Sequence, residues 1–209
     1  MAEDLPSLNA AQVEAETDSF TPYRYAQFAR HLGDASRILD VGCSTGRGGE
    51  VLRDALPGAR LEGLEMLAAR AARIPAGVYD AVTVGDLATL AASGTRFDAL
   101  VMGELIEHVP YRALEDFVSS ARAVLSPGGR LLLTTPNPHY LFLRWRGGSV
   151  MGGAHVSVHC AAALSELIDH QGFRVTRIEG TGRVSRGVGV RLPLAVYGSY
   201  LLIAERLEG

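Results

Sequence analysis

Two carboxylates and an imidazole follow an apolar run in the segment LVMGELIEHVP, residues 100–110. If a helix begins at Glu104, then Glu107 and His108 stand three and four residues further on and share its face. Two close carboxylates repel each other and need a positive counter-charge, which a divalent cation supplies. Oxygen-rich ligation with one imidazole suits Mg²⁺ or Mn²⁺ better than a structural zinc site. The spacing therefore predicts a metal site.

A glycine-rich loop, ILDVGCSTGRGG at residues 38–49, stands between a predicted strand and a predicted helix. Glycines let the backbone approach a ligand closely, and the N-terminus of the helix supplies free N–H donors. The dinucleotide fingerprint needs glycines at the first, third and sixth positions, which here hold Gly42, Ser44 and Arg47. The loop therefore predicts a ligand site of another kind.

Glu65 ends the second predicted strand, 19 residues after Gly46. A carboxylate in this place can accept hydrogen bonds from both hydroxyls of a ribose. Acidic residues at strand ends are common without a ligand, so Glu65 gains its meaning only together with the other landmarks.

Apolar segments alternate with helical patterns along the chain after residue 20. Strands are predicted at 37–42, 59–65, 81–86, 97–104, 129–136, 174–180 and 198–207, with helical patterns at 48–56, 66–74, 113–124 and 162–171. Strands that are apolar on both faces and separated by helices indicate a mostly parallel sheet covered on both sides. We expect an α/β fold with seven strands, the last pair including an antiparallel edge. Residues 21–209 then form a single domain, preceded by a mobile arm at 1–20.

The overall composition is that of a globular protein, with 47% hydrophobic residues and a formal charge of −3. The composition lacks the excess of basic residues that is typical of chains that bind nucleic acids or anionic membranes. Two cysteines, Cys43 and Cys160, are too few for a disulfide framework. The start of the chain is acidic without the apolar core of a signal peptide, and no apolar run reaches the ~20 residues that span a bilayer. We therefore expect a cytoplasmic protein with no membrane partner.

The D-x-G-x-x-x-G loop at 40–46 resembles that of class I S-adenosylmethionine-dependent methyltransferases, in which the position of Ser44 is usually glycine. GDL at 85–87 and LSPGG at 125–129 are similar to further landmarks of that family. The resemblance implies a Rossmann-like fold, with Asp86 facing the adenine amine and Leu87 packing on its ring. TPYRYAQF at 21–28 resembles a segment of the ubiquinone-biosynthesis enzymes, which implies that Arg24 contacts the cofactor carboxylate. The cofactor-binding residues expected from the resemblance are Arg24, Asp40, Gly42, Ser44, Gly46, Glu65, Asp86, Leu87 and Gly103.

The pattern E-x-x-E-H-V at 104–109 resembles the metal site of the ubiquinone-biosynthesis O-methyltransferases and of the small-RNA terminal 2′-O-methyltransferases. The second group has a further histidine ligand, which implies His155 as a fourth ligand beside Glu104, Glu107 and His108, with His159 as the competing choice. His139 and His159 are the candidates for catalytic histidines. Many metal-free methyltransferases also carry a Glu-His pair here, and in them the histidine packs on the cofactor or acts as a base.

These features predict a Mg²⁺- or Mn²⁺-assisted O-methyltransferase that acts on a saccharide hydroxyl or another vicinal diol. Trp145, flanked by Arg144 and Arg146, could stack on a sugar ring, or could simply be a lid residue packed on the core. The methylmannose-polysaccharide methyltransferases are one similar group. The acceptor would be a small molecule or an oligosaccharide, the acidic balance argues against long RNA, and an oligomer stays open. The alternatives are a metal-independent methyltransferase of a small phenol or amine, and a non-catalytic regulator that binds S-adenosylmethionine.

Overall fold

A computed structural model describes residues 19–208 of the chain. The mobile arm that the sequence predicts at 1–20 therefore lies, apart from its last two residues, outside the described residues. Within the described part, no helix combines the length and the apolar character that crossing a membrane requires.

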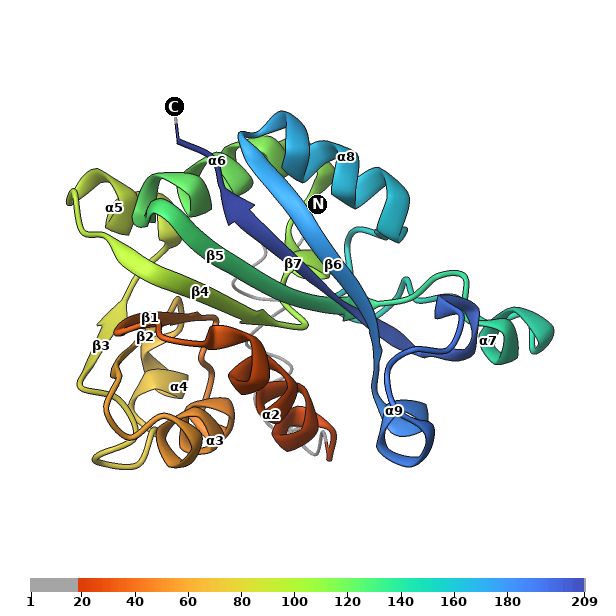
Figure 1. The fold of residues 1–209 in the computed structure, drawn as a ribbon, viewed down its shortest axis with the longest axis horizontal. Coiled ribbons are helices and arrows are strands. Elements are labelled where there is room, and N and C mark those ends of the chain that lie inside the picture. Colours follow the sequence, from red (N-terminus) through yellow and green to blue (C-terminus); the bar gives the residue numbers. More distant parts are fainter. Residues whose placement is uncertain (1–18, 209) are drawn as a thin grey trace.

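Seven strands form one sheet in the order β3-β2-β1-β4-β5-β7-β6 (Figure 1). All neighbours pair in parallel except β7, which runs antiparallel to both β5 and β6. This confirms the predicted Rossmann-like sheet with an antiparallel strand near its edge. The strands are β1 (Arg37–Val41), β2 (Arg60–Glu65), β3 (Ala81–Val84), β4 (Phe97–Gly103), β5 (Leu125–Pro136), β6 (Phe173–Thr181) and β7 (Ser199–Arg206).

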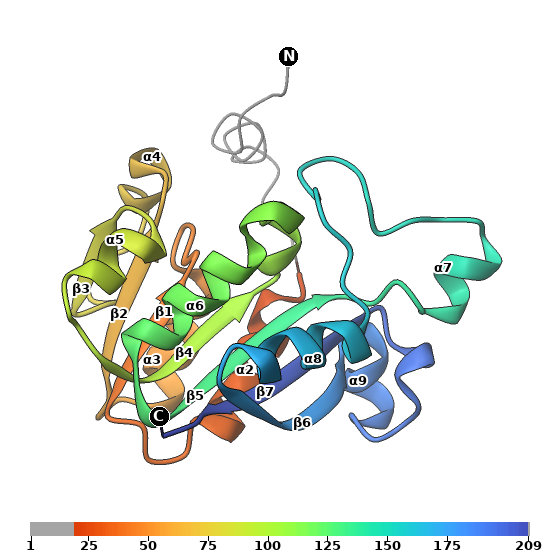
Figure 2. The same ribbon diagram turned by 90° about the horizontal axis from the view of Figure 1, so that it is seen from above.

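Helices cover both faces of the sheet, because alternate strand residues point to opposite sides (Figure 2). Leu39, Leu100 and Leu131 join one buried cluster with the helices after β3, β4 and β5. Ile38, Val101 and Leu132 join the other, with the two helices that flank β1. The helices are α2 (Thr21–Leu32), α3 (Arg47–Ala55), α4 (Ala68–Ala71), α5 (Leu87–Ala92), α6 (Leu114–Val124), α7 (Leu141–Trp145), α8 (Ala161–His170) and α9 (Arg183–Val188).

The prediction of a helix that begins at Glu104 is wrong. The backbone N–H of Glu104 donates to the carbonyl of Thr134 at 3.1 Å, and its φ is 52°, in the left-handed region. The chain thus turns sharply after β4, and only a 3₁₀ turn, Ile106–His108, follows. The helix predicted at 66–74 is likewise reduced to the four residues of α4.

Candidate functional site

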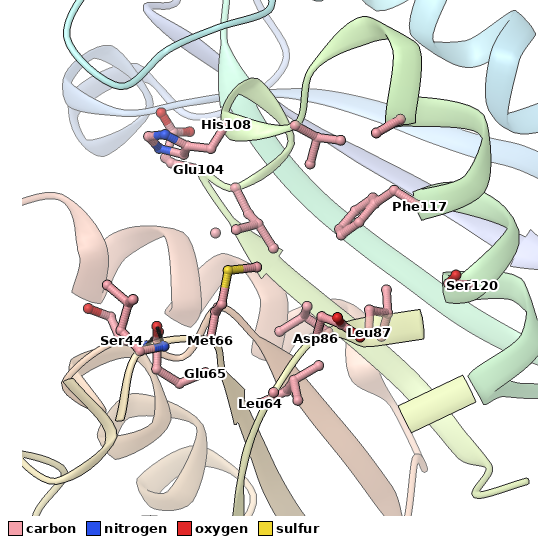
Figure 3. A pocket seen from close by; sticks show the side chains of 18 of the residues that line it. Ser44, Leu64, Glu65, Met66, Asp86, Leu87, Glu104, His108, Phe117 and Ser120 are labelled. Atoms are coloured by element: carbon pink, nitrogen blue, oxygen red, sulfur yellow. Dashed lines mark hydrogen bonds between the residues drawn. The ribbon is translucent and has the colours of Figure 1, made fainter. Parts of the chain in front are cut away.

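A cavity of about 690 Å³ opens at the carboxyl ends of β1, β2 and β4 (Figure 3). Ligands of open α/β sheets bind at this edge. The predicted site residues that line it are Arg24, Gly42, Ser44, Glu65, Asp86, Leu87, Gly103, Glu104, His108 and His155. The predicted residues that do not line it are Asp40, Gly46, Glu107, His139 and His159.

The glycine loop makes its turn with three residues of positive φ, namely Gly42 (73°), Ser44 (52°) and Gly46 (88°). A side chain on Gly42 would collide with Leu105, because its Cβ would come within 2.9 Å of that leucine. Gly46 is the residue before α3, so the loop delivers the chain directly to a helix N-terminus. Ser44 holds a left-handed conformation that glycine adopts at lower cost.

Glu65 ties the glycine loop to the end of β2. Its Oε2 accepts a hydrogen bond from the backbone N–H of Ser44, and its Oε1 accepts one from Leu67, both at 2.9 Å. Each carboxylate oxygen has a second lone pair, so Glu65 can still accept from two ligand hydroxyls. Its position on the cavity wall suits the ribose of a nucleoside (Figure 3).

Asp40 is fully buried beneath the loop. Its Oδ1 accepts from the Tyr25 hydroxyl at 2.8 Å, and its Oδ2 accepts from the Tyr79 hydroxyl at 2.6 Å. Burial raises the pKa of Asp40 to about 7, while the two tyrosine hydrogen bonds oppose that rise. Asp40 therefore positions the loop and does not line the cavity.

The sequence did not predict the role of the two tyrosines, although the paired glycines Gly48 and Gly49 indicate close packing at the start of α3. A Cβ on Gly48 would come within 2.2 Å of the Tyr25 ring, and one on Gly49 within 2.3 Å of the Tyr79 ring. The first turn of α3 needs glycines because the two rings pack against its backbone.

Asp86 and Leu87 lie at the far end of the cavity, near Phe117 (Figure 3). Asp86 caps α5, since its Oδ1 accepts from the Thr89 N–H at 2.7 Å. This bond lowers the pKa of Asp86, so the carboxylate is ionised and can accept a further N–H donor. Leu87 and Phe117 add an apolar wall suited to a flat ring.

Arg24 and Glu104 form an ion pair on the cavity wall, with 3.5 Å between Nε and Oε1. The Ser199 hydroxyl donates to Glu104 Oε2 at 3.3 Å. Glu104 therefore faces a cation of α2 in this structure, and it is not part of the compact group of ligand atoms described next.

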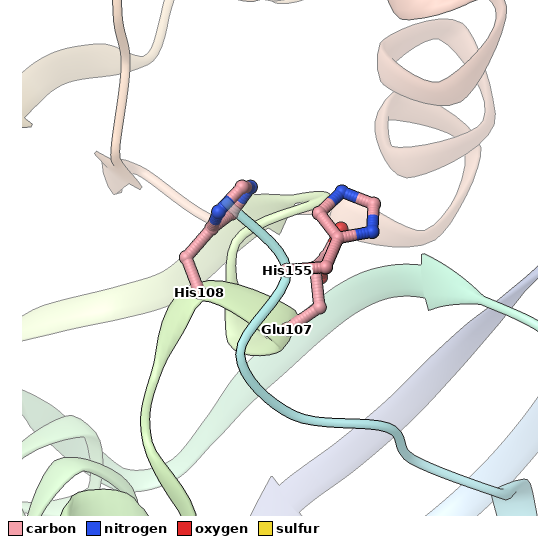
Figure 4. Close-up of side chains that lie close together, drawn as sticks. All are labelled: Glu107, His108 and His155. Carbon is pink, nitrogen blue, oxygen red and sulfur yellow. The ribbon is translucent and has the colours of Figure 1, made fainter. Parts of the chain in front are cut away.

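Glu107, His108 and His155 come together beside the cavity (Figure 4). Each offers a ligand atom, and these atoms lie within 4.8 Å of one another. The backbone N–H groups of Val156 and Ser157 donate to the Glu107 carbonyl, at 2.9 and 3.1 Å, which fixes the loop of His155 against the 3₁₀ turn. The structure thus brings His155, predicted only from a resemblance, next to two of the three residues predicted from spacing.

The protonation of this trio is set by its neighbours. His108 Nδ1 lies 2.9 Å from the carbonyl of Ala154, and His155 Nδ1 lies 2.8 Å from that of Val150. A carbonyl only accepts, so each Nδ1 carries a proton, and in the neutral form of each ring Nε2 keeps the lone pair, which is the tautomer that binds metals. Burial lowers the pKa of His108, which favours the neutral ring.

Glu107 is 2% exposed, and the Thr135 hydroxyl donates to its Oε2 at 3.0 Å. Its Oε1 has no hydrogen-bond partner among the described residues. Burial, followed by the charge of Glu104, raises the pKa of Glu107 well above its usual range. A buried carboxylate oxygen without a partner, next to two imidazole lone pairs, fits a bound cation.

His139 and His159 do not reach the cavity. His139 is exposed, and its backbone N–H donates to the Asn137 side chain at 3.0 Å. His159 is buried against Tyr111, with its Nε2 2.7 Å from the Ser157 hydroxyl. Its surroundings are those of a packed core histidine. The catalytic role predicted for these two residues gains no support from their positions.

Comparison with known proteins shows the family to which this chain is similar. The profile of a family described as "Methyltransferase domain" matches residues 16–178. A probable S-adenosylmethionine-dependent methyltransferase of Mycolicibacterium smegmatis is 32% identical over 170 residues, which cover 80% of this chain and 62% of that protein. A ubiquinone biosynthesis O-methyltransferase of Alkalilimnicola ehrlichii is 36% identical over 139 residues, covering 58% of this chain and 52% of the relative.

The chain thus spans about half to three-fifths of these two relatives. A crystal structure of an S-adenosylmethionine-dependent methyltransferase from Archaeoglobus fulgidus shares the fold, with a TM-score of 0.70 at 16% identity over 88% of this chain and 92% of that one. The family match covers most of the chain, and the mostly parallel seven-stranded sheet and the glycine loop are those expected from the sequence. The chain therefore belongs to the methyltransferase-domain family, and it has the fold of the class I S-adenosylmethionine-dependent methyltransferases.

Proposed function

We propose that this chain transfers the methyl group of S-adenosylmethionine to a hydroxyl oxygen of a saccharide or another vicinal diol, with the help of Mn²⁺ or Mg²⁺. The observation that carries the metal part is the trio Glu107, His108 and His155, with its unpartnered carboxylate oxygen and its two Nε2 lone pairs. The O-methyltransferase activity is supported by the ubiquinone-biosynthesis relatives.

S-adenosylmethionine supplies a methyl group that is already activated, so the protein has to position it and to prepare the acceptor. Glu65 would accept from the ribose hydroxyls, and Asp86 from the adenine amine, with Leu87 against the ring. Arg24 would pair with the carboxylate of the methionine part. These residues line one continuous cavity, which spans from α5 to the ion pair of Arg24.

The donor set of the trio is one carboxylate and two imidazoles, and it favours Mn²⁺ over Mg²⁺. Mg²⁺ prefers six oxygen ligands, whereas imidazole suits transition metals. A divalent cation held there would lower the pKa of an acceptor hydroxyl near the cavity. Two neighbouring hydroxyls fit such a site best, because the trio leaves more than one ligand position for oxygen atoms.

The test is a transfer assay with methyl-labelled S-adenosylmethionine and a panel of saccharides, catechols and RNA ends. We expect EDTA to abolish transfer to a diol and added Mn²⁺ to restore it. His155→Gln should lose the Mn²⁺-dependent transfer while S-adenosylhomocysteine still binds, and the exposed His170→Gln is the matched control. Full activity in EDTA would favour the metal-independent methyltransferase, and cofactor binding without turnover on any acceptor would favour the regulator.

A further inference from the structure

Two segments of the chain, residues 136–165 and 180–198, contain no Asp or Glu. Together they carry five arginines, all of them exposed: Arg144, Arg146, Arg183, Arg186 and Arg191. The remaining described residues carry 15 arginines against 18 acidic residues. The chain-wide charge of −3 thus averages over regions of opposite sign, and it hides a basic region.

Large apolar side chains stand exposed among these arginines. On α7, Trp145 is 80% exposed, and Leu141 and Phe142 are also exposed. At the end of α9 and just after it, Val188 is 60% exposed and Leu192 is exposed as well. Such clustering of exposed apolar side chains marks an interaction surface. We call residues 141–146 and 183–192 the basic–apolar surface.

The two parts of this surface are held together. The Asn137 side chain, just before α7, donates to the carbonyls of Leu194 and Tyr197, at 2.8 and 3.0 Å. These two hydrogen bonds connect segment 136–165 to segment 180–198. The Tyr197 hydroxyl donates to the Gly189 carbonyl and accepts from the Leu192 N–H. Figures 1 and 2 both show α7 and α9 at the same end of the molecule, with α7 projecting away from the sheet. Both helices follow the carboxyl ends of their strands, the edge that also holds the cavity.

We propose that the basic–apolar surface docks the chain on an anionic phospholipid bilayer. Arginines attract the negative lipid head groups, and exposed Trp, Phe and Leu side chains gain by entering the interface between head groups and acyl chains. Aliphatic side chains such as Leu141, Val188 and Leu192 gain nothing from a nucleic-acid backbone, so the combination favours a bilayer over RNA. This surface departs from the expectation of no membrane partner, which rested on the averaged charge and on the lack of a signal peptide or a long apolar run.

Docking there would bear on the site, because one connection joins α7 to α8 and carries His155. If the proposed function also holds, an acceptor hydroxyl on a lipid head group could enter the cavity from the membrane side. The docking itself does not depend on the methyl-transfer chemistry.

Trp145 is the single tryptophan of the chain, so its fluorescence reports on this surface alone. We expect vesicles of phosphatidylcholine mixed with phosphatidylglycerol to shift its emission to shorter wavelength and to sediment the protein at low salt. Pure phosphatidylcholine vesicles should do neither. Binding that is equal for both kinds of vesicle, or absent for the anionic kind, would overturn the proposal.

Paired variants test the charges. Arg144→Glu with Arg146→Glu should weaken partitioning roughly thirtyfold or more, since each arginine near an anionic surface contributes about fivefold. Arg73→Glu with Arg96→Glu makes the same charge change on exposed arginines outside the basic–apolar surface, and it should leave binding within about twofold. If Trp145 is protected from a quencher in a dimer without vesicles, the surface binds a second copy of the chain. If its fluorescence responds to an RNA oligonucleotide but not to vesicles, the surface binds RNA. Either result would overturn the proposal.

Discussion

Ser44 and Glu104 are the two described non-glycine residues with positive φ, both at 52°. Both stand on the cavity wall, one in the glycine loop and one directly after β4. Backbone strain of this kind is retained where the surrounding structure over-determines it, and it concentrates at ligand sites. The sequence identified both residues as site candidates, but it could not reveal the turn at Glu104, because that turn depends on a hydrogen bond to Thr134, 30 residues away.

Replacing Ser44 with glycine should stabilise the fold slightly. A left-handed conformation costs a non-glycine residue about 1–2 kcal/mol, and the extra freedom of glycine in the unfolded chain takes back about 0.4–1 kcal/mol. We therefore expect the free energy of unfolding in urea to rise by about 0.5 kcal/mol. Ser44→Ala, which keeps a Cβ, should show no gain. A loss of stability in Ser44→Gly would contradict the strain argument.

Replacing Glu107 with glutamine should separate stability from metal binding. Glutamine can still accept from the Thr135 hydroxyl, and it removes a carboxyl that is costly to bury, so the unfolding free energy without metal should rise by about 1–2 kcal/mol near pH 8. The same variant should lose the stabilisation that Mn²⁺ gives to the parent chain, measured in urea with and without the ion. The exposed Glu115→Gln should change neither quantity. A Glu107→Gln chain that Mn²⁺ still stabilises would remove this residue from the metal site.

At the scale of elements, Asp40 joins α2, β1 and the chain before β3 through the hydroxyls of Tyr25 and Tyr79. The strands and the helices α3, α6 and α8 could be predicted, because apolar runs, glycines and prolines are local signals. This network could not, because its partners are 15 and 39 residues away from Asp40 and tyrosine at those positions has no distinctive pattern. The resemblance assigned Asp40 to the cofactor, whereas the structure places it in support of the loop.

The raised pKa of Asp40 predicts a specific dependence of stability on pH. Its pKa rises from 3.8 to about 7 on folding, so the folded state holds this proton more tightly than the unfolded state. The resulting stabilisation is complete below about pH 4 and is lost as the pH rises through about 7. Asp40→Asn should flatten the unfolding free energy over that range, in urea titrations at several pH values. Asp34→Asn, at an exposed carboxylate, should keep the slope of the parent chain, and an equal slope in both variants would show that Asp40 is not the titrating group.

At the scale of the whole molecule, the sheet order brings together loops that are distant in the sequence. The trio of Glu107, His108 and His155 combines the turn after β4 with the loop before α8, and the basic–apolar surface combines the segments after β5 and β6. His155 lies close to Glu107 and His108, as the predicted ligand set requires, and its role as a metal ligand stays a prediction. The ion pair between Glu104 and Arg24 could not be predicted from the sequence, because that contact depends on how α2 packs against β4.

This pairing predicts coupling between the two ligands. If Arg24 turns to the carboxylate of a bound cofactor, Glu104 loses its cation and becomes available to the metal beside Glu107. S-adenosylhomocysteine, which carries the same carboxylate, should therefore tighten Mn²⁺ binding by roughly fivefold or more, and by thermodynamic linkage Mn²⁺ should tighten S-adenosylhomocysteine binding by the same factor. Isothermal titration in both orders measures the two factors.

Arg24→Gln should remove this coupling, because Glu104 then forms no ion pair with Arg24 that cofactor binding could break. In this variant Mn²⁺ should bind more tightly on its own, and S-adenosylhomocysteine, although it binds more weakly, should add nothing further to the affinity for Mn²⁺. Arg30→Gln is the matched control, since Arg30 is an exposed arginine on the same helix, and it should retain the coupling. Coupling of equal size in Arg24→Gln and in the parent chain would mean that the two sites communicate by another route, or that Glu104 never takes part in holding the metal.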